Sequence, residues 1–520
     1  MPRNRRSTAT LRARGARGAV TLLVTGTLVL AACGGDSGGG GGESRSGDTG
    51  DGVLKLALEN TPSGWDWRKQ ITAAHSGLAW RPVFDTLLRT RVDGTVEPNA
   101  AQEFSYNADK TVLTLELREG MTFTDGAPVD AEAAKFALEN FRDGGGPDSP
   151  RLTGVTVDVV DDLTLTVTLP APDPAFTSFL GGAPGALVSP ATLESPTLDT
   201  EPIGSGPYTL NAEETVTGSA FVFERNPDYW NPDDFPHDKV EILVMADETA
   251  QLNSLASGQI DGAEIDLGSI ERAKSSGMHV ESFPNVWSGL MLLDRAGTKI
   301  PALGDVRVRQ AINMVFDREA ISAAIWNGNG QANPQIFGPT TSGYQEDLLD
   351  YYDYDVEAAK KLMEEAGYAD GFDITLPDIG GYTDEYTTIT VQQLALLNIR
   401  AQVIPVPRTE STARILKGEF PIFAWKMSVS PEVGLVSNLL TPNGSYNPFS
   451  SEDPELNELL AKWAVADPDE TADIYQEINE FLLENAWFAP FGNPAVLWAF
   501  NDTTTISGTL GSTPPLFEFQ

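Results

Sequence analysis

Alternation of apolar and polar side chains predicts β-strands in the first third of the chain. Residues 163–169 read LTLTVTL, in which every second position is apolar. A strand of this kind buries one face of a sheet. The segment 155–160 precedes it across Asp161 and Asp162, so we expect the two segments to form a hairpin. Residues 113–117 alternate in the same way and predict a further strand.

Other segments have the spacing of amphipathic helices. Asp355 is a suitable N-cap and Gly367 a suitable end. The apolar positions between them share one helical face: Val356, Ala359, Leu362, Met363 and Ala366. Asp305 can start a second helix that runs to Val315. In the stretches 240–260 and 373–404 a strand is followed by a helix, which predicts mixed α and β structure in two separate lobes.

The first 32 residues have the order of charged and apolar positions that is typical of a secretory signal. They contain six arginines and no acid, and they end in an apolar run, 19–32, that is too short to span a membrane. The run ends at Leu30-Ala31-Ala32-Cys33, which resembles a bacterial lipobox. We therefore expect cleavage before Cys33 and acylation of that cysteine. The alternative is an uncleaved anchor followed by an unmodified cysteine. The pair Arg5-Arg6 is compatible with secretion by the twin-arginine route, although ordinary secretion is the expectation.

Residues 33–52 are almost entirely Gly, Ser, Asp, Glu and Thr, which predicts a flexible tether. The string Gly35-Asp36-Ser37-Gly38-Gly39 copies the surroundings of a serine-protease nucleophile. A nucleophile requires a base that a rigid scaffold holds within hydrogen-bond reach. We therefore interpret this string in a tether as a coincidence.

Composition excludes several classes of function. The 520 residues include 35 Lys and Arg against 74 Asp and Glu, a net charge of −39 that would repel nucleic acid. One cysteine and three histidines, His75, His237 and His279, leave little material for a disulfide framework or a metal site. We expect no cofactor and no protein-built metal site, so that a metal could arrive only inside a chelator.

A series of motifs runs from residue 83 to residue 371. The longest is 115–140, LELREGMTFTDGAPVDAEAAKFALEN. The others are VFDTLL at 83–88, GSGPY at 204–208, RNPDYW at 225–230, LASGQIDGA at 255–263, DVRVRQAINMVFDREAI at 305–321 and YDVEAAKKLMEEAGYADG at 354–371. Together these motifs resemble the extracytoplasmic solute-binding proteins of the oligopeptide, dipeptide and nickel family, which serve ATP-driven importers. Most of these residues are expected to be structural, with a turn at Asp125-Gly126, a helix start at Asp130 and a close crossing of segments at 204–208.

The resemblance implies a two-lobed α/β fold like that of periplasmic binding proteins, with an interlobe cleft and an extra subdomain on the first lobe. The implied organisation is a lipoprotein signal peptide at 1–32, a tether at 33–52, the first lobe at 53–86, 200–298 and 485–520, the extra subdomain at 87–199, and the second lobe at 299–484. The implied partners are a solute, a membrane permease with its cytoplasmic ATPase, and the membrane through the lipid on Cys33. The protein is expected to be a monomer that stays outside the membrane.

The resemblance also implies which residues line the cleft. They are Trp67, Thr72 and His75 in an early loop, Trp287, Trp326 and Tyr382, and the segment around Trp425, Met427 and Ser428. Aromatic rings give a large contact area at low entropic cost. The alternative for each aromatic residue is packing in the core, which is the expectation for Trp65.

Peptide-binding members commonly have an aspartate three positions after the tryptophan that Trp425 matches, and its carboxylate holds the α-ammonium of the peptide. This chain has Ser428 there, and Glu432 is the only acid between 420 and 440. A hydroxyl cannot neutralise a desolvated ammonium. Either another acid supplies that charge, or the ligand is not a peptide with a free amino group.

The sequence therefore predicts a non-enzymatic, substrate-binding subunit of an ABC importer. Its ligand is a peptide, sugar, opine or chelate. Two alternatives remain, a secreted lipoprotein hydrolase and a surface adhesion module. The chain has no HExxH motif and no phosphate-binding loop, which disfavours the hydrolase.

Overall fold

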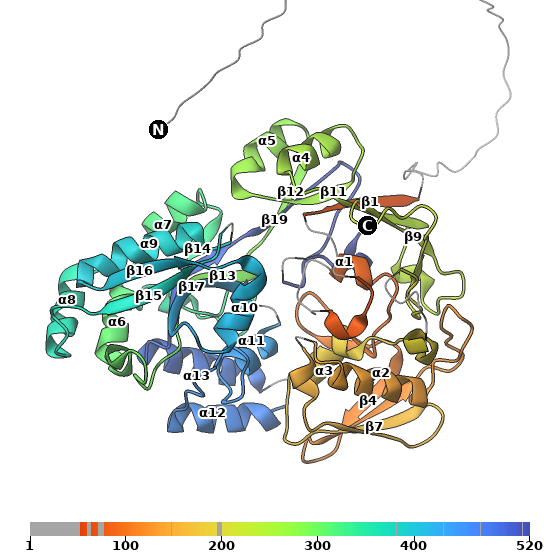
Figure 1. The fold of residues 1–520 in the computed structure, drawn as a ribbon, viewed down its shortest axis with the longest axis horizontal. Coiled ribbons are helices and arrows are strands. Elements are labelled where there is room, and N and C mark those ends of the chain that lie inside the picture. Colours follow the sequence, from red (N-terminus) through yellow and green to blue (C-terminus); the bar gives the residue numbers. More distant parts are fainter. Residues whose placement is uncertain are drawn as a thin grey trace, which may run out of the picture. The chain divides into compact units, whose positions relative to one another are not determined.

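The computed structural model describes residues 52–59, 64–70, 77–146, 148–194, 200–380, 382–429, 431–467, 470–511 and 513–520. The predicted signal sequence, Cys33, and the candidate site residues Thr72 and His75 lie outside these ranges. Within them the chain forms mixed α and β structure, as the pattern of strands and helices predicts (Figure 1).

A seven-stranded sheet organises the first lobe. Its strands run in the order β12-β19-β11-β1-β10-β9-β8. Their bounds are β1 (Val53–Leu58), β8 (Tyr208–Leu210), β9 (Ala220–Arg225), β10 (Lys239–Val244), β11 (Gly262–Ile265), β12 (His279–Phe283) and β19 (Val496–Phe500). Strand β1 is parallel to both β10 and β11, and the other pairs are antiparallel. Helices α4 (Glu248–Ala256) and α5 (Ile270–Ser275) supply apolar side chains to a core that includes Ala57 and Ala263.

A four-stranded antiparallel sheet lies within the predicted extra subdomain. Its order is β4-β5-β7-β6, with β4 (Ala101–Tyr106), β5 (Val112–Leu117), β6 (Thr156–Val159) and β7 (Thr164–Thr168). The predicted hairpin is confirmed, because Thr156 pairs with Thr168 and Val159 with Leu165. Also in this part of the chain are α2 (Ala131–Asp143), α3 (Phe176–Leu180), and the strand pair β2 (Leu88–Thr90) and β3 (Val96–Pro98). The short helix α1 (Gly77–Trp80) precedes them.

The second lobe contains two sheets. One has the order β14-β18-β13-β17, with β13 (Val286–Leu292), β14 (Gly330–Ala332), β17 (Ile422–Ser428) and β18 (Phe488–Pro494). The other is the parallel pair β15 (Asp373–Asp378) and β16 (Arg400–Pro405), connected through α9 (Asp384–Leu394). The remaining helices are α6 (Val306–Met314), α7 (Arg318–Ile325), α8 (Val356–Glu365), α10 (Arg408–Leu416), α11 (Glu432–Leu439), α12 (Pro454–Val465) and α13 (Thr471–Glu484).

The predicted caps are found where the sequence places them. The Asp355 side chain accepts a hydrogen bond from the Ala358 amide at the start of α8, and Asp305 caps α6 in the same way. Asp130 caps α2 through the Ala133 amide. Each cap satisfies a backbone N–H that has no partner inside its helix.

The chain passes between the seven-stranded sheet and the sheet of the second lobe at two places. Residues 284–285 separate β12 from β13, and Ala495 alone separates β18 from β19 (Figure 1). Strands β13 and β18, which the predicted boundaries assign to the first lobe, pair with β17 and β14 of the second. Two hydrogen bonds hold the Asn285 side chain at the first crossing. Asn285 Nδ2 donates to the Thr509 carbonyl at 3.1 Å, and Asn285 Oδ1 accepts from the Thr340 hydroxyl.

The motif at 83–88 crosses the motif at 204–208 at close range. The Gly206 amide donates to the Val83 carbonyl at 2.8 Å. A Cβ on Gly204 would lie 2.1 Å from that same carbonyl oxygen, which is far inside contact distance. These glycines therefore serve the close approach of two backbones, as the structural interpretation of the motifs predicts.

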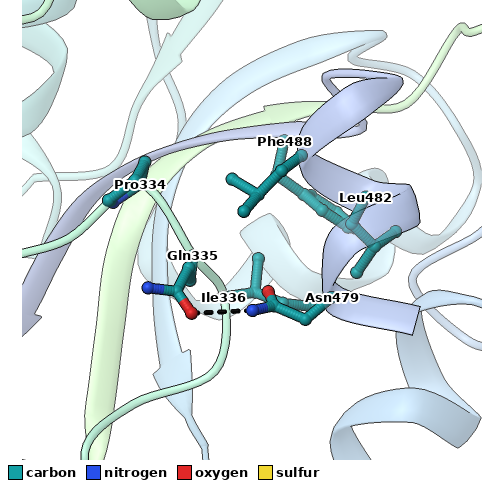
Figure 2. A pocket seen from close by; sticks show the side chains of 7 residues that line it. Pro334, Gln335, Ile336, Asn479, Leu482 and Phe488 are labelled. Carbon is teal, nitrogen blue, oxygen red and sulfur yellow. Dashed lines mark hydrogen bonds between the residues drawn. The ribbon is translucent and has the colours of Figure 1, made fainter. Parts of the chain in front are cut away.

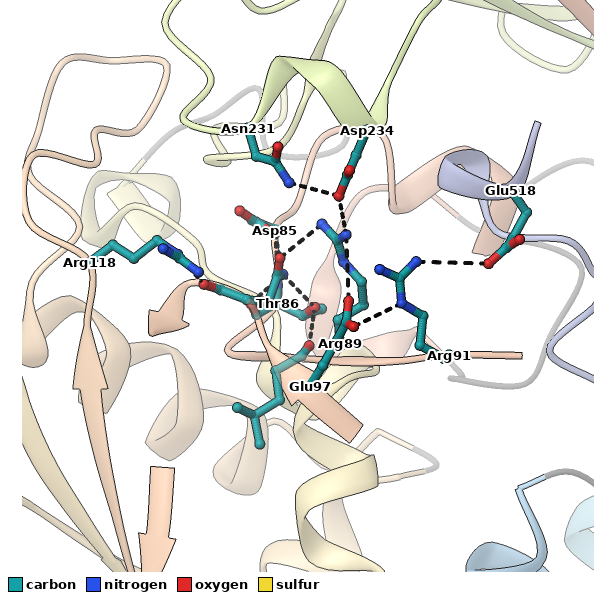
Figure 3. A network of polar contacts seen from close by, with 11 residues as sticks. Asp85, Thr86, Arg89, Arg91, Glu97, Arg118, Asn231, Asp234 and Glu518 are labelled. Atoms are coloured by element: carbon teal, nitrogen blue, oxygen red, sulfur yellow. Dashed lines mark hydrogen bonds and ion pairs between the residues drawn. The ribbon is translucent and has the colours of Figure 1, made fainter. Parts of the chain in front are cut away.

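A network of buried charges joins these motifs to their surroundings (Figure 3). The Asp85 carboxylate accepts hydrogen bonds from Trp230 Nε1 at 2.8 Å and from Asn99 Nδ2 at 2.6 Å. Arg89 Nη2 donates to Asn99 Oδ1, and Arg89 Nη1 lies 2.5 Å from Asp234 Oδ2. Each charged group in this chain of contacts thus has a hydrogen-bonded partner, which is what burial of charge requires.

Candidate ligand-binding site

Three aromatic rings lie together beside the middle of β17. The ring of Trp425 is 5.2 Å from that of Tyr382 and 6.1 Å from that of Tyr446. Tyr382 precedes α9, and Tyr446 follows α11. Trp425 is 5 % exposed, and both tyrosines are half-buried. Burial raises the pKa of Tyr382 and brings that of Tyr446 to about 12, so both hydroxyls stay neutral near pH 7.

Two cationic side chains lie over the ring of Tyr382. The Lys426 Nζ is 4.7 Å from the ring centroid, and the Arg408 Cζ is 4.9 Å from it. The Tyr382 hydroxyl donates to the Lys426 carbonyl at 2.9 Å, which fixes the ring against β17. The electron-rich face of the ring attracts both cations.

Burial sets the electrostatics of Lys426. Removal from water lowers its pKa, Glu264 acts in the opposite direction, and the positive charge of Arg408 lowers it further. Arg408, at the start of α10, is exposed. The lysine is therefore a charged group held in a poorly solvated position.

The acids that act on Lys426 come from the first lobe. Glu264 lies in β11, Asp266 follows this strand, and Glu59 follows β1. Strands β1 and β11 are parallel neighbours, so their carboxyl ends meet at one edge of the sheet, where ligands commonly bind in α/β proteins. Burial raises the pKa of Glu264 to about 8; Lys426 opposes this rise, and Glu59 and Asp266 add to it.

Four of the predicted site residues are brought together here. Tyr382 contacts Trp425, and Trp425, Met427 and Ser428 are neighbours in β17. Met427 and Ser428 are half-buried. Successive side chains of a strand alternate between its faces, so Ser428 stands on the same face as Lys426.

All four predicted tryptophans are buried, and Trp425 belongs to the same apolar cluster as Trp287. Trp67, Trp287 and Trp326 are each 0 % exposed. Trp67 Nε1 donates to the Ala137 carbonyl, and Trp326 Nε1 donates to the Tyr386 hydroxyl at 3.1 Å. Trp287 packs edge-on against Phe488. Trp65 is buried between Phe221 and Phe223, as the sequence predicts.

Glu432, the acid nearest in sequence to Ser428, is engaged within the second lobe. It accepts hydrogen bonds from the Ser342 hydroxyl and from the Gly343 amide. Burial raises its pKa, and these hydrogen bonds oppose the rise. We therefore do not assign it the role of a missing ammonium partner.

Sequence reasoning missed Lys426, Arg408, Tyr446 and Glu264. A signal existed for two of them, because Lys426 interrupts the apolar strand IFAWKMS and Glu264 interrupts the apolar segment GAEI. A charge inside a buried strand is rare unless it has a partner or a function. Arg408 lies in a polar segment and Tyr446 in a loop, so neither is distinguished by its pattern.

Two hollows elsewhere in the described part of the chain do not include these residues. Figure 2 shows a small cavity beneath β18, lined by Pro334, Gln335, Ile336, Asn479, Leu482, Leu483 and Phe488. Asn479 Nδ2 donates to Gln335 Oε1 at 2.7 Å in this cavity, whereas Asn479 Oδ1 is buried without a hydrogen-bond partner among the described residues. A second recess is lined by Thr122, Phe123, Thr124, Gly126, Thr209, Asn226, Pro227 and Asp228, which belong mainly to the family-like motifs.

Across the described ranges, His, Cys, Asp and Glu side chains do not form a group of three that could hold a metal ion. A helix long and apolar enough to cross a membrane is likewise absent from those ranges.

The sequence is similar to curated transport proteins over most of its length. The oligopeptide-binding protein OppA of Bacillus subtilis (strain 168) is 24% identical over 491 residues, which cover 85% of this chain and 87% of that protein. The glutathione-binding protein GsiB of Salmonella typhi is 25% identical over 424 residues, covering 76% of this chain and 80% of that protein.

Solved structures show the same fold. The binding protein DppA of Helicobacter pylori, in complex with the peptide STSA, superposes with a TM-score of 0.75 at 21% identity and covers 90% of this chain and 97% of its own. AgaA of A. tumefaciens R10, in complex with agropinic acid, has a TM-score of 0.76 at 22% identity and covers 90% and 96%. These are periplasmic binding proteins, so the predicted two-lobed α/β class is confirmed.

The family model described as bacterial extracellular solute-binding proteins, family 5 Middle, matches residues 95–449. That range includes the subdomain sheet, most strands of the first lobe, and β17 with Lys426. The chain therefore belongs to the family 5 bacterial extracellular solute-binding proteins.

Proposed function

We propose that this protein is the substrate-binding subunit of an ABC importer. It captures a peptide or another small organic solute outside the membrane and delivers it to a permease driven by a cytoplasmic ATPase. The observation that carries this proposal is the family match over residues 95–449. The protein releases its solute unchanged, and it is not an enzyme.

We place the solute between the lobes, beside Tyr382, Trp425, Met427 and Ser428. Binding there requires the lobes to move relative to each other. The contacts between the subdomain and the second lobe include Lys110 with Asp467 at 3.0 Å and Arg151 with Asn438 at 2.8 Å. The Asp467 side chain is well exposed, and exposed ion pairs contribute little to stability, so this contact can break at small cost.

The predicted lipid anchor belongs to the same proposal. Acylation of Cys33 keeps the protein at the outer face of the membrane beside its permease, and the segment 33–52 gives it reach. Labelling cells with an alkyne fatty acid should mark the wild-type protein. A Cys33→Ala variant should stay unlabelled and appear in the culture medium. Equal labelling of both would contradict the anchor.

Ligand capture is tested by native mass spectrometry of the gently purified protein, followed by thermal-shift measurements. The ligands named for similar proteins define the first panel: di- to pentapeptides, glutathione and agropinic acid. We expect a retained solute or a rise in unfolding temperature, and recovery of the solute unchanged. Formation of a cleaved product would instead favour the hydrolase alternative. The absence of any retained mass and of any shift would contradict solute capture.

A further inference from the structure

Lys426, which is half-buried, and Arg408, which is exposed, differ from the charges of the network around Asp85 and Arg89. Neither head group makes a hydrogen bond or an ion pair with any residue in the part of the chain that the structure describes. Both lie within 5 Å of the centroid of one ring, that of Tyr382. Two like charges in this arrangement repel each other, and one of them has also lost most of its water.

We propose that Lys426 and Arg408 bind an anionic group of the solute, a carboxylate in the simplest case, beside Tyr382. This assignment rests on the proposed function, because it names the chemistry of the solute that the protein captures. An anion that binds both cations reduces their repulsion and supplies a hydrogen-bond acceptor to the poorly solvated Lys426. The aromatic face of Tyr382 fixes the two head groups in position before the solute arrives.

The position of Ser428 supports the same polarity. The resemblance to peptide binders predicts an acid at this position to hold a ligand ammonium. The chain instead has a neutral hydroxyl there, on the same face of β17 as Lys426. An ammonium bound at this place would meet a cation rather than an acid, so the second lobe is suited to an anionic end of the solute.

The first lobe limits how much negative charge the site accepts. Glu264, Asp266 and Glu59 all act electrostatically on Lys426, in the direction that raises its pKa. The carboxylates of Asp266 and Glu59 repel an anion, whereas Lys426 and Arg408 attract it. The arrangement therefore favours one anionic group held in direct contact with the second lobe, over a solute with negative charge along its whole length.

The test compares probes that differ only in one negative charge. Isothermal titration of the purified protein uses trialanine against trialanine amide, and glucuronate against glucose. We expect at least one acid to bind about tenfold or more tightly than its neutral counterpart, because a hydrogen bond to a charged group contributes more than one to a neutral group. We further expect Lys426→Met to weaken binding of that acid about tenfold and to leave binding of the neutral counterpart unchanged. Lys426→Arg should restore part of the lost affinity for the acid.

Two further variants keep the result interpretable. Arg408→Gln changes an exposed side chain, so the variant should fold normally. It should weaken binding of the acid by a smaller factor, about threefold. Lys417→Met makes the same chemical change as Lys426→Met at an exposed position at the end of α10 and should alter no affinity.

The possible failures are distinguishable. Equal binding of acid and neutral probe, with no effect of Lys426→Met, overturns the anionic assignment and leaves solute capture intact. If none of the four probes binds, the anionic assignment is overturned for both peptides and sugars. The proposal of solute capture is then decided by the retained mass and the thermal shifts alone.

Discussion

Two groups of charged side chains in this protein differ in whether their head groups have partners in the protein. Around Asp85 and Arg89, each charged head group has hydrogen-bonded partners from the surrounding motifs (Figure 3). Around Tyr382, the cations Lys426 and Arg408 have none within the described residues. The first group joins segments that are distant in sequence, and the second lies beside β17, in the sheet that both crossing strands enter.

The difference separates a structural network from a binding site. Removing one member of a satisfied buried network leaves its partners unpaired, which lowers the stability of the fold. Removing a cation that has no partner relieves repulsion and desolvation instead. A strong effect on stability is therefore expected in the first group, and a strong effect on ligand affinity in the second.

The largest effect on stability is expected from Asp85→Asn. The carboxylate of Asp85 accepts hydrogen bonds from Trp230 Nε1 and Asn99 Nδ2, and the new amide would place an N–H group against one of these donors. Loss of the negative charge also removes the attraction to Arg89. We expect the free energy of unfolding, measured by urea titration, to fall by about 3 kcal/mol. A fall of less than about 1 kcal/mol would show that the network is not needed for stability.

A pH-dependent effect of intermediate size is expected from Glu264→Gln. The folded-state pKa of Glu264, about 8, lies above its unfolded value of about 4.5, so the folded state binds the extra proton. The contribution of Glu264 is therefore fully present below pH 4.5 and is lost as the pH rises through 8. Relative to Glu264→Gln, the wild type should lose about 1 to 3 kcal/mol of unfolding free energy between pH 5 and pH 8. A parallel pH profile for the two proteins would contradict this.

A smaller change in stability is expected from Lys426→Met. The substitution removes a charge that burial destabilises and keeps most of the apolar stem. The unfolding free energy at pH 7 should stay within about 1 kcal/mol of the wild type or rise. If it fell by more than about 2 kcal/mol, Lys426 would belong with the structural network.

The smallest effect is expected at an ordinary surface ion pair. Arg400 lies 2.6 Å from Asp373 across the parallel strands β15 and β16, with both side chains more than half exposed. Arg400→Gln should change the unfolding free energy by less than about 0.5 kcal/mol. A larger loss would mean that exposed pairs contribute as much as buried ones here, which would weaken the comparison.

Local patterns predicted much of the fold. The alternation at 163–169 and the caps at Asp355 and Asp305 depend on neighbours in sequence, and each is confirmed. The site was predicted only in part. Trp287 and Trp425 look alike in sequence, and only the packing around them shows that both lie in one buried cluster, where Trp287 packs edge-on against Phe488.

The sequence could not predict which charges of the site act on each other, because the interactions join distant elements. Lys426 meets Arg408 through the ring of Tyr382, and it meets Glu264 through the arrangement of β17 and β11. No local spacing encodes these contacts. The sequence shows that Ser428 replaces the expected aspartate. Only the fold shows that Lys426 lies on the same face of the strand as Ser428.

One measurement tests the comparison most directly: urea unfolding of the wild type, Asp85→Asn and Lys426→Met, each with and without a saturating concentration of the best acidic probe. A bound ligand raises the unfolding free energy by an amount set by its affinity. We predict that Asp85→Asn loses stability without ligand but keeps the full ligand-induced increment. Lys426→Met should keep its stability and lose most of the increment. If Lys426→Met keeps the increment, or if both variants lose stability and increment together, the account is contradicted.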